Sequence, residues 1–193
     1  MNHFKTPFHV VVSTYVVWPT ISNDALLPHT LPPKMRAVIQ RVKKASVTVD
    51  NEILSKIERG LVVLVGVSPE DTEEDCKKVA KKVTSLRFWP DADDTQWKKN
   101  IADIRGQIIC VSQFTLYGKV NKGAKPDFHG AAKGEQAYAL YQKTRELIGG
   151  LMPNGMADVG DGRFGAMMDV ELINDGPTTI QFDTRQWLKI RLY

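Results

Sequence analysis

The sequence predicts a single compact α/β (α+β) domain: a mostly antiparallel or mixed β-sheet, or a barrel-like core, with two main helices packed on it. Short apolar or alternating segments bounded by Gly, Pro, Asn or Asp predict the strands. Two longer segments repeat apolar residues at helical spacing and predict the helices. The chain has 193 residues, of which 42% are hydrophobic and 25% charged. This length suffices for one full core, and the composition is ordinary for a globular protein.

The first half of the predicted domain contains four strands and one helix. The strands are expected over residues 37–42, 46–49, 52–57 and 61–67. The last of these is fully apolar, which is typical of a central strand buried on both faces. A helix is expected from Thr72, which with Asp75 approximates a capping box, and acidic residues precede lysines along it.

The second half adds shorter strands and a second helix. Strands are expected over residues 87–89, 107–112, 156–159, 167–173 and 178–182, and a helix over 135–148. Gly149-Gly150 ends that helix, and residues 174–177 form a turn between the last two strands. In the penultimate strand, alternation places Val170 and Leu172 inward.

Two terminal segments flank the predicted domain, which covers residues 35–182. Residues 1–34 hold only nine consecutive apolar or small residues, too few to span a bilayer, and no arginine, which weighs against a mitochondrial transit peptide. We expect a poorly ordered N-terminal extension or an upstream start, with a cleaved targeting segment as the alternative. Residues 183–193 form a C-terminal tail that is apolar enough to pack on the body.

Charge and reactive residues exclude several classes of protein. The net charge of +4 permits a polyanionic partner without requiring one. His129 is the only histidine after residue 34, so neither a Cys/His zinc site nor a Ser-His-Asp triad is expected, and we predict no metal and no cofactor. Cys76 and Cys110, without a secretory signal, indicate buried thiols in a reducing, cytoplasmic setting and no membrane association.

Polar residues follow the buried strand 107–112 at the point where it leaves the core. Ser112, Gln113 and Thr115 lie within four positions of one another, ahead of Gly118. Side chains in such a position have rigid structure behind them and solvent in front, which suits a binding or catalytic site. The alternative is a strand end whose hydroxyls bond its own backbone.

A downstream motif extends this observation. Ser112-Gln113-Phe114-Thr115, followed by Asn174-Asp175-Gly176-Pro177 and Thr179, resembles the D-aminoacyl-tRNA deacylase family. Residues 35–42 are similar to the opening strand of that family, and the resemblance extends to about Phe182. It implies a homodimer that hydrolyses the ester between a D-amino acid and the 3′-terminal ribose of tRNA.

The resemblance also implies roles for individual residues. Ser112, Gln113, Phe114 and Thr115 would form the catalytic motif, with Gly176-Pro177 as a cis peptide that enters the partner's site and rejects L-amino acids. Phe164 would bind the terminal adenosine, although it can equally be a core phenylalanine. The remaining residues implied are Asn174 for the substrate, and Lys122 and Lys125 for tRNA. Lys125 stands where the family has an arginine, so phosphate attraction is kept but bidentate geometry is lost.

Two mechanisms and two rival functions remain open. Water can attack the ester with main-chain N–H groups of Phe114 and Thr115 as oxyanion donors, or Thr115 can act as a nucleophile although no base is evident. The filter would admit glycine esters, since glycine has no side chain to exclude. The rivals are a non-catalytic RNA-binding or adaptor protein on the same fold, and a related deacylase group with Pro-Gln-Ala-Thr at the first motif, which this chain lacks.

Overall fold

The structure is a computed structural model that describes residues 34–120 and 123–187. The chain divides into a unit Met1–Leu31 and a unit Pro32–Tyr193, and all the elements described below belong to the second. The expectations for residues 1–33, for Lys122 and for the tail beyond residue 187 lie outside the described residues.

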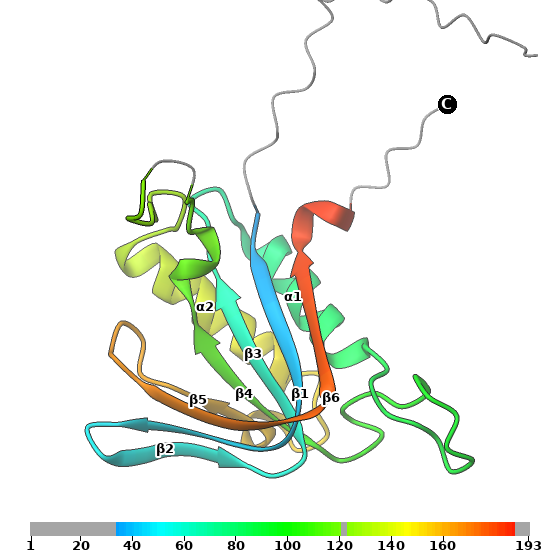
Figure 1. The fold of residues 1–193 in the computed structure, drawn as a ribbon. Helices are drawn as coiled ribbons and strands as arrows, with labels where there is room; N and C mark the ends of the chain where they lie inside the picture. The colour runs from blue at the N-terminus through cyan, green and yellow to red at the C-terminus, as the bar shows by residue number, and fades with distance from the viewer. Residues whose placement is uncertain (1–33, 121–122, 188–193) are drawn as a thin grey trace, which may run out of the picture. The chain divides into compact units, whose positions relative to one another are not determined.

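The core is one mixed sheet that curls toward a barrel (Figure 1). Its main path runs in the order β2-β1-β3-β4-β5, and β6 also pairs with β1. The strands are β1 (Arg36–Val49), β2 (Glu52–Ile57), β3 (Gly60–Gly66), β4 (Gln107–Ser112), β5 (Val159–Asp161) and β6 (Asp169–Asp183). β1 is antiparallel to β2, β3 and β6, whereas β3, β4 and β5 run parallel. The predicted fold class is therefore confirmed.

The central strands are apolar on both faces because both faces are covered. In β3, Leu61, Val63 and Val65 belong to the core beneath the helices, whereas Val62 belongs to a second cluster on the opposite face. The helices are α1 (Glu73–Ser85) and α2 (Gly134–Gly149). They cover the first face, as Figure 1 shows. This explains why the segment 61–67 lacks the alternation of a half-exposed strand.

Two predicted pairs of strands are single long strands in the structure. Residues 37–42 and 46–49 both belong to β1, whose pairing with β6 shifts register between Arg41 and Lys44. The predicted turn at 174–177 is instead a bulge within β6, since Val42 pairs with Asn174 and Arg41 with Thr178. Glycine and proline therefore mark an interruption of pairing here and not the end of a strand.

Two short strand predictions were wrong. Residues 155–158 form a 3-10 helix, η2 (Gly155–Asp158), and the strand β5 begins only at Val159. The Asp158 carboxylate accepts hydrogen bonds from the main chain and side chain of Asn154, at 2.9 and 3.0 Å, and so favours the turn. Of residues 87–89, only Trp89 pairs, in an isolated bridge with Lys99, because Pro90 follows it.

The end of the fold is fastened to the start of α1. The 3-10 helix η3 (Thr184–Trp187) follows β6, and the buried Thr184 hydroxyl donates to Asp75 Oδ1 at 2.8 Å. The Thr184 main-chain N–H donates to the Met35 carbonyl at 3.0 Å. Burial favours a higher pKa of Asp75, but hydrogen bonds from Thr184 and Thr72, with the Lys34 charge, lower it below the ordinary value. The chain thus packs on the body two residues beyond the expected boundary at Phe182.

A second carboxylate nearby makes stability depend on pH. The Ser68 main-chain N–H and hydroxyl donate to the Asp71 carboxylate at 2.7 and 2.8 Å, yet burial raises the pKa of Asp71 to about 6. The folded state therefore holds a proton that the unfolded state releases near pH 4. This group's contribution to stability is present below pH 4 and is lost as pH rises to 6.

We expect Asp71→Asn to reveal this titration. The free energy of unfolding of the wild type, measured relative to the variant, should fall by about 2 kcal/mol from pH 4 to pH 7, because the carboxyl group is buried and its pKa is raised from 3.8 to about 6. Above pH 7 the difference should be constant. Urea unfolding at a series of pH values measures it, and a difference that rises with pH would contradict the assignment.

Candidate active site

The main cavity lies where β3 and β4 leave the core and has a volume of about 580 Å³. It brings together segments that are far apart in the chain. Its lining consists of Val65, Val67, Val111, Ser112, Gln113, Phe114, Thr115, Ala132, Lys133, Gly134, Ala137, Phe164, Gly165, Ala166, Met167, Met168 and Val170. Four of the predicted site residues, Ser112–Thr115, and Phe164 therefore face one space.

The strand end is held rigidly before the chain turns. The Gln113 main-chain N–H donates to the Val65 carbonyl at 2.8 Å and extends the pairing of β4 with β3 by one residue. Gly66 permits this close approach, because a Cβ there would lie 2.9 Å from the Tyr117 ring and 3.1 Å from the Gln113 carbonyl. The chain then enters the 3-10 helix η1 (Phe114–Tyr117). Phe114 and Thr115 thus open a helical turn whose first N–H groups lack intrahelical acceptors.

The polar side chains in the cavity offer hydrogen bonds and no base. Gln113 Nε2 lies 2.5 Å from Thr115 Oγ1. Neither atom of an amide group is a base at neutral pH, so this contact orients the hydroxyl without activating it. Among the described residues that line the cavity, Lys133 is the only one with a charged side chain.

Phe164 forms the aromatic wall of the cavity. Its ring lies 5.3 Å from that of Tyr138 and 5.8 Å from that of Tyr141. Tyr141 is fixed by its hydroxyl, which lies 2.5 Å from Asp161 Oδ1 and donates to the Cys110 carbonyl at 3.0 Å. Burial is the main cause of the raised pKa of Tyr141, which stays neutral. Phe164 is thus both packed against the core and open to the cavity, so the two interpretations of this residue are compatible.

The Gly176-Pro177 peptide is cis, as the family resemblance implied, but it does not line the main cavity. Gly176 and Pro177 lie exposed on the bulge of β6, and Gly176 has φ +118°. Asn174 lies at the start of this bulge, where its amide donates to the Arg41 carbonyl at 3.4 Å. The two family motifs are therefore separate within one subunit.

Arg41 is a functional candidate that the sequence-based predictions missed. Its Nε atom lies 3.1 Å from the Asp175 carbonyl and 3.2 Å from Asp175 Oδ2. Its Nη1 atom donates to the Phe88 carbonyl. One guanidinium group thus joins the bulge of β6 to the segment after α1. A lone arginine in a strand carries no pattern that distinguishes it from a surface residue.

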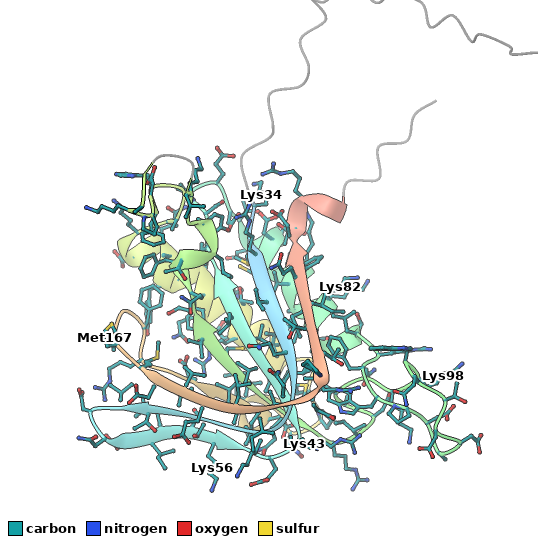
Figure 2. The ribbon with its side chains drawn as sticks, viewed as in Figure 1. Lys34, Lys43, Lys56, Lys82, Lys98 and Met167 are labelled. Atoms are coloured by element: carbon teal, nitrogen blue, oxygen red, sulfur yellow. The ribbon has the colours of Figure 1, made fainter. Side chains whose placement is uncertain are left out.

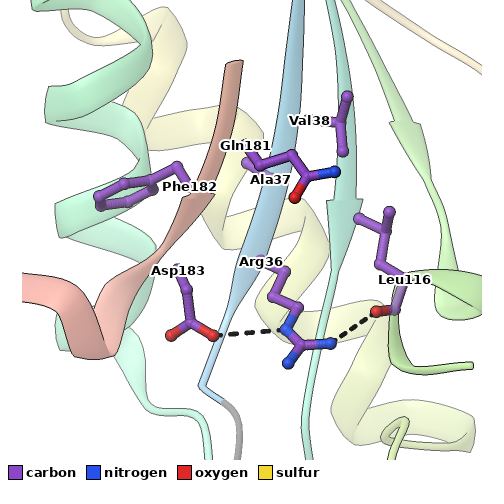
Figure 3. Close-up of a pocket in the computed structure, with 7 residues that line it drawn as sticks. All are labelled: Arg36, Ala37, Val38, Leu116, Gln181, Phe182 and Asp183. Carbon is purple, nitrogen blue, oxygen red and sulfur yellow. Dashed lines mark hydrogen bonds and ion pairs between the residues drawn. The ribbon is translucent and has the colours of Figure 1, made fainter. Parts of the chain in front are cut away.

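A second arginine, Arg36, contacts the 3-10 helix η1 (Figure 3). Arg36 Nη1 donates to the Leu116 carbonyl at 2.7 Å, and its Nε atom lies 3.3 Å from Asp183 Oδ2. These residues border a surface hollow of about 310 Å³ between β1, β6 and η1. Because Leu116 is two residues beyond Phe114, Arg36 braces the helical turn whose first residues, Phe114 and Thr115, line the main cavity.

Of the lysines implied in tRNA binding, Lys125 is described, and it lies outside the main cavity. Lysines elsewhere are spread over different elements, as Lys43, Lys56, Lys82 and Lys98 show in Figure 2. Among the described residues, no three His, Cys, Asp or Glu side chains gather as a metal site requires. Neither α1 nor α2, nor any other helix in the described part of the chain, has the length and apolarity of a membrane span.

Comparison with known proteins identifies the family. The model of the family described as D-Tyr-tRNA(Tyr) deacylase matches residues 38–183. A D-aminoacyl-tRNA deacylase of Yarrowia lipolytica is 57% identical over 152 residues, which cover 78% of this chain and 98% of that protein. The solved structure of the c-Myc DNA Unwinding Element Binding Protein is 44% identical, with a TM-score of 0.71, and the match covers 76% of this chain and 97% of that one.

The fold has a more distant counterpart as well. The structure named "Structural Analysis of a probable eukaryotic D-amino acid tRNA deacylase" aligns with a TM-score of 0.66 at 17% identity, covering 77% of this chain and 98% of that one. At this identity the likeness shows that the two chains share a fold. The chain belongs to the D-Tyr-tRNA(Tyr) deacylase family, as the motifs at 112–115 and 174–177 predicted.

Proposed function

We propose that this protein hydrolyses the ester bond of D-aminoacyl-tRNA and releases the free D-amino acid and tRNA, as a proofreading step in translation. The observation that carries the proposal is the cavity that gathers Ser112–Thr115 and Phe164 in a chain of the deacylase family. The volume of about 580 Å³ suits an amino acid esterified to a terminal adenosine.

Water is the nucleophile in the mechanism that we favour. The ester carbonyl develops negative charge as water attacks, and in this scheme the main-chain N–H groups of Phe114 and Thr115, at the start of η1, donate to it. Gln113 and Ser112 orient the ester and the water through hydrogen bonds. Lys133, at the edge of the cavity, attracts the phosphate of the terminal nucleotide. No side chain of the described lining acts as a general base in this scheme.

In this proposal, main-chain atoms of a second subunit distinguish D-amino acids from L-amino acids. Gly176 and Pro177 protrude from β6, a 15-residue strand that has β1 as its only partner among the described strands. Ile173 and Val170 on this strand are 48% and 36% exposed, so the prediction that Val170 points inward was wrong. A long edge strand with exposed apolar residues favours association with another copy of the chain. In the homodimer, the Gly176-Pro177 carbonyls face the substrate's α-carbon and exclude a side chain in the L arrangement.

The decisive experiment compares three esters of the same tRNA, charged with D-tyrosine, L-tyrosine or glycine. We expect rapid loss of the D-tyrosine ester, measurable loss of the glycine ester and none of the L-tyrosine ester above the rate without protein. Hydrolysis of none of the three, by a protein that still binds tRNA, would favour the adaptor function instead.

Thr115→Ala separates the two mechanisms. Because the Thr115 hydroxyl has no base beside it, we expect the variant to keep a deacylation rate within about threefold of the wild type, as loss of one orienting hydrogen bond predicts. Removal of a true nucleophile costs several orders of magnitude in kcat. Single-turnover deacylation of D-tyrosyl-tRNA measures the rate, with a matched variant, Thr95→Ala, in an exposed loop as control.

A further inference from the structure

Another cavity, the lateral cavity, adjoins the main cavity and has a volume of about 480 Å³. The two share Phe114, Ala132 and Lys133 as a common wall. Beyond that wall, the lateral cavity is bordered by Lys125, Phe128 and His129. A ligand that fills the main cavity and continues past Phe114 therefore enters the lateral cavity.

The lateral cavity is built from ordered contacts. Lys119 and Asp127 exchange main-chain hydrogen bonds of 2.8 and 2.9 Å, which set the direction of the segment that carries Phe128. The Ala132 N–H donates to the Val67 carbonyl at 2.8 Å and ties the far end of the wall to the chain just beyond β3. The rings of Phe114 and Phe128 meet edge to face, with centroids 5.2 Å apart. Phe114 is nevertheless 57% exposed, so its face is open to a planar ligand.

The charges around the lateral cavity favour an anion. Lys125 and Lys133 are both exposed cations at its border. The one carboxylate, Asp127, accepts hydrogen bonds from the main-chain N–H of His129 at 2.8 Å and from its ring, and these contacts with His129 lower the pKa of Asp127. Asp127 therefore stays negative, but the two lysines outnumber it along the lining of the lateral cavity. Lys133 also directly precedes α2, whose N-terminal dipole adds positive potential.

We propose that the lateral cavity binds the nucleotide that precedes the terminal adenosine of tRNA, with phosphate between Lys125 and Lys133 and base against Phe114. The inference rests on the proposed function, because it requires the terminal adenosine in the main cavity. In a single-stranded 3′ end, the 5′ phosphate of the last nucleoside connects it to the preceding nucleotide. The wall shared by the two cavities carries a cation, Lys133, and an aromatic ring, Phe114, where this phosphate would pass. Aromatic faces with adjacent cations are the common means of holding single-stranded nucleotides.

Equilibrium binding of uncharged fragments tests the lateral cavity independently of catalysis. The probes are adenosine and the dinucleotide cytidylyl-(3′→5′)-adenosine, titrated into the full-length protein and followed by NMR. We expect the dinucleotide to bind at least tenfold more tightly, and its log K to fall with log salt at a slope of about −0.7 for the one phosphate. Equal affinities of the two probes would overturn the proposal.

Variants then locate the second nucleotide. Lys125→Gln should weaken the dinucleotide about three- to tenfold and flatten its salt dependence, and Phe128→Leu should weaken it while keeping the salt slope. Lys56→Gln, which removes an equal charge from exposed β2 (Figure 2), should change neither affinity. If Lys125→Gln weakens adenosine and dinucleotide by the same factor, the second nucleotide does not bind here. Failure of the proposed function appears differently, as tight fragment binding without hydrolysis of any ester.

Discussion

Gly176→Ala is expected to lower deacylation of D-tyrosyl-tRNA about 10- to 100-fold. Gly176 has φ +118°, and a Cβ atom there would lie 2.8 Å from Thr178 Oγ1 and 3.1 Å from Arg41 Nη2. Backbone conformations of this kind cost about 1–3 kcal/mol for a residue with a side chain, and each 1.4 kcal/mol of transition-state energy is about tenfold in rate. The bulge must shift, so the carbonyls that we propose to face the substrate's α-carbon lose their position. Steady-state kinetics with D-tyrosyl-tRNA measure the loss.

Gly155→Ala is the matched control for this substitution. Gly155 also has a positive φ, of 64°, but a Cβ atom there would have no atom beyond its immediate neighbours within 4 Å, and the residue belongs to η2, outside the main cavity. We expect Gly155→Ala to cost stability and leave the rate unchanged. Equal loss of rate in both variants would mean that strain anywhere in the fold, and not at the filter, lowers activity.

A mixing experiment asks which subunit supplies the filter. Phe164→Ala damages the main cavity, and Gly176→Ala damages the bulge, so in the proposed homodimer each variant alone should be nearly inactive. If the bulge acts on the partner's cavity, a mixed dimer holds one site with both defects and one with neither. Random exchange makes about half of the dimers mixed, which predicts about a quarter of wild-type activity. If the bulge acts within its own subunit, every site carries one defect and no activity returns.

Most of the fold was predictable because it depends on local patterns. The strands 37–42, 46–49 and 52–57, the apolar strand 61–67 and the two helices follow from local residue patterns and from caps, and all are present. The error at residues 174–177 occurs where a pairing partner decides the outcome. Whether residues 174–177 turn the chain or bulge from a strand depends on the facing strand, β1, which continues past Arg41 without turning. No local property of Gly176-Pro177 contains that information.

In the candidate site, too, some residues could be predicted from local patterns and others depend on distant parts of the chain. Ser112–Thr115 were predictable because polar residues at the end of a buried strand must lie near its exit, and they do line the main cavity. Phe164 remained ambiguous, since a ring that packs on Tyr141 and borders a cavity has the composition of a core residue in either role. Arg41 and Lys133 were not singled out because the surroundings that make them candidates, the β6 bulge and the wall shared by the two cavities, form only in the folded chain.

Arg41→Ala is the second substitution with a large expected effect. Arg41 is only 11% exposed and pairs with Asp175, which is 28% exposed, so its removal leaves a partly buried carboxylate without its cation. Loss of one partner from a fully buried pair costs about 3–5 kcal/mol, and partial exposure reduces this to about 2 kcal/mol here. We expect lower stability in urea unfolding, a fall in D-tyrosyl-tRNA deacylation and weaker discrimination against L-tyrosyl-tRNA, since the bulge is released on one side.

The contacts of Arg41 allow its effect on stability to be separated from its effect on the position of the β6 bulge. Asp175→Asn removes only the carboxylate contact, because the Asp175 carbonyl that Arg41 Nε also reaches belongs to the main chain. We therefore expect Asp175→Asn to lower stability less than Arg41→Ala and to keep most of the discrimination between D and L esters. Arg41→Lys restores the charge but cannot reach Phe88 and Asp175 together, since an ammonium lacks the planar fork of a guanidinium. Full discrimination in Arg41→Lys would show that charge alone positions the bulge, and loss of discrimination would assign that role to the geometry of the guanidinium.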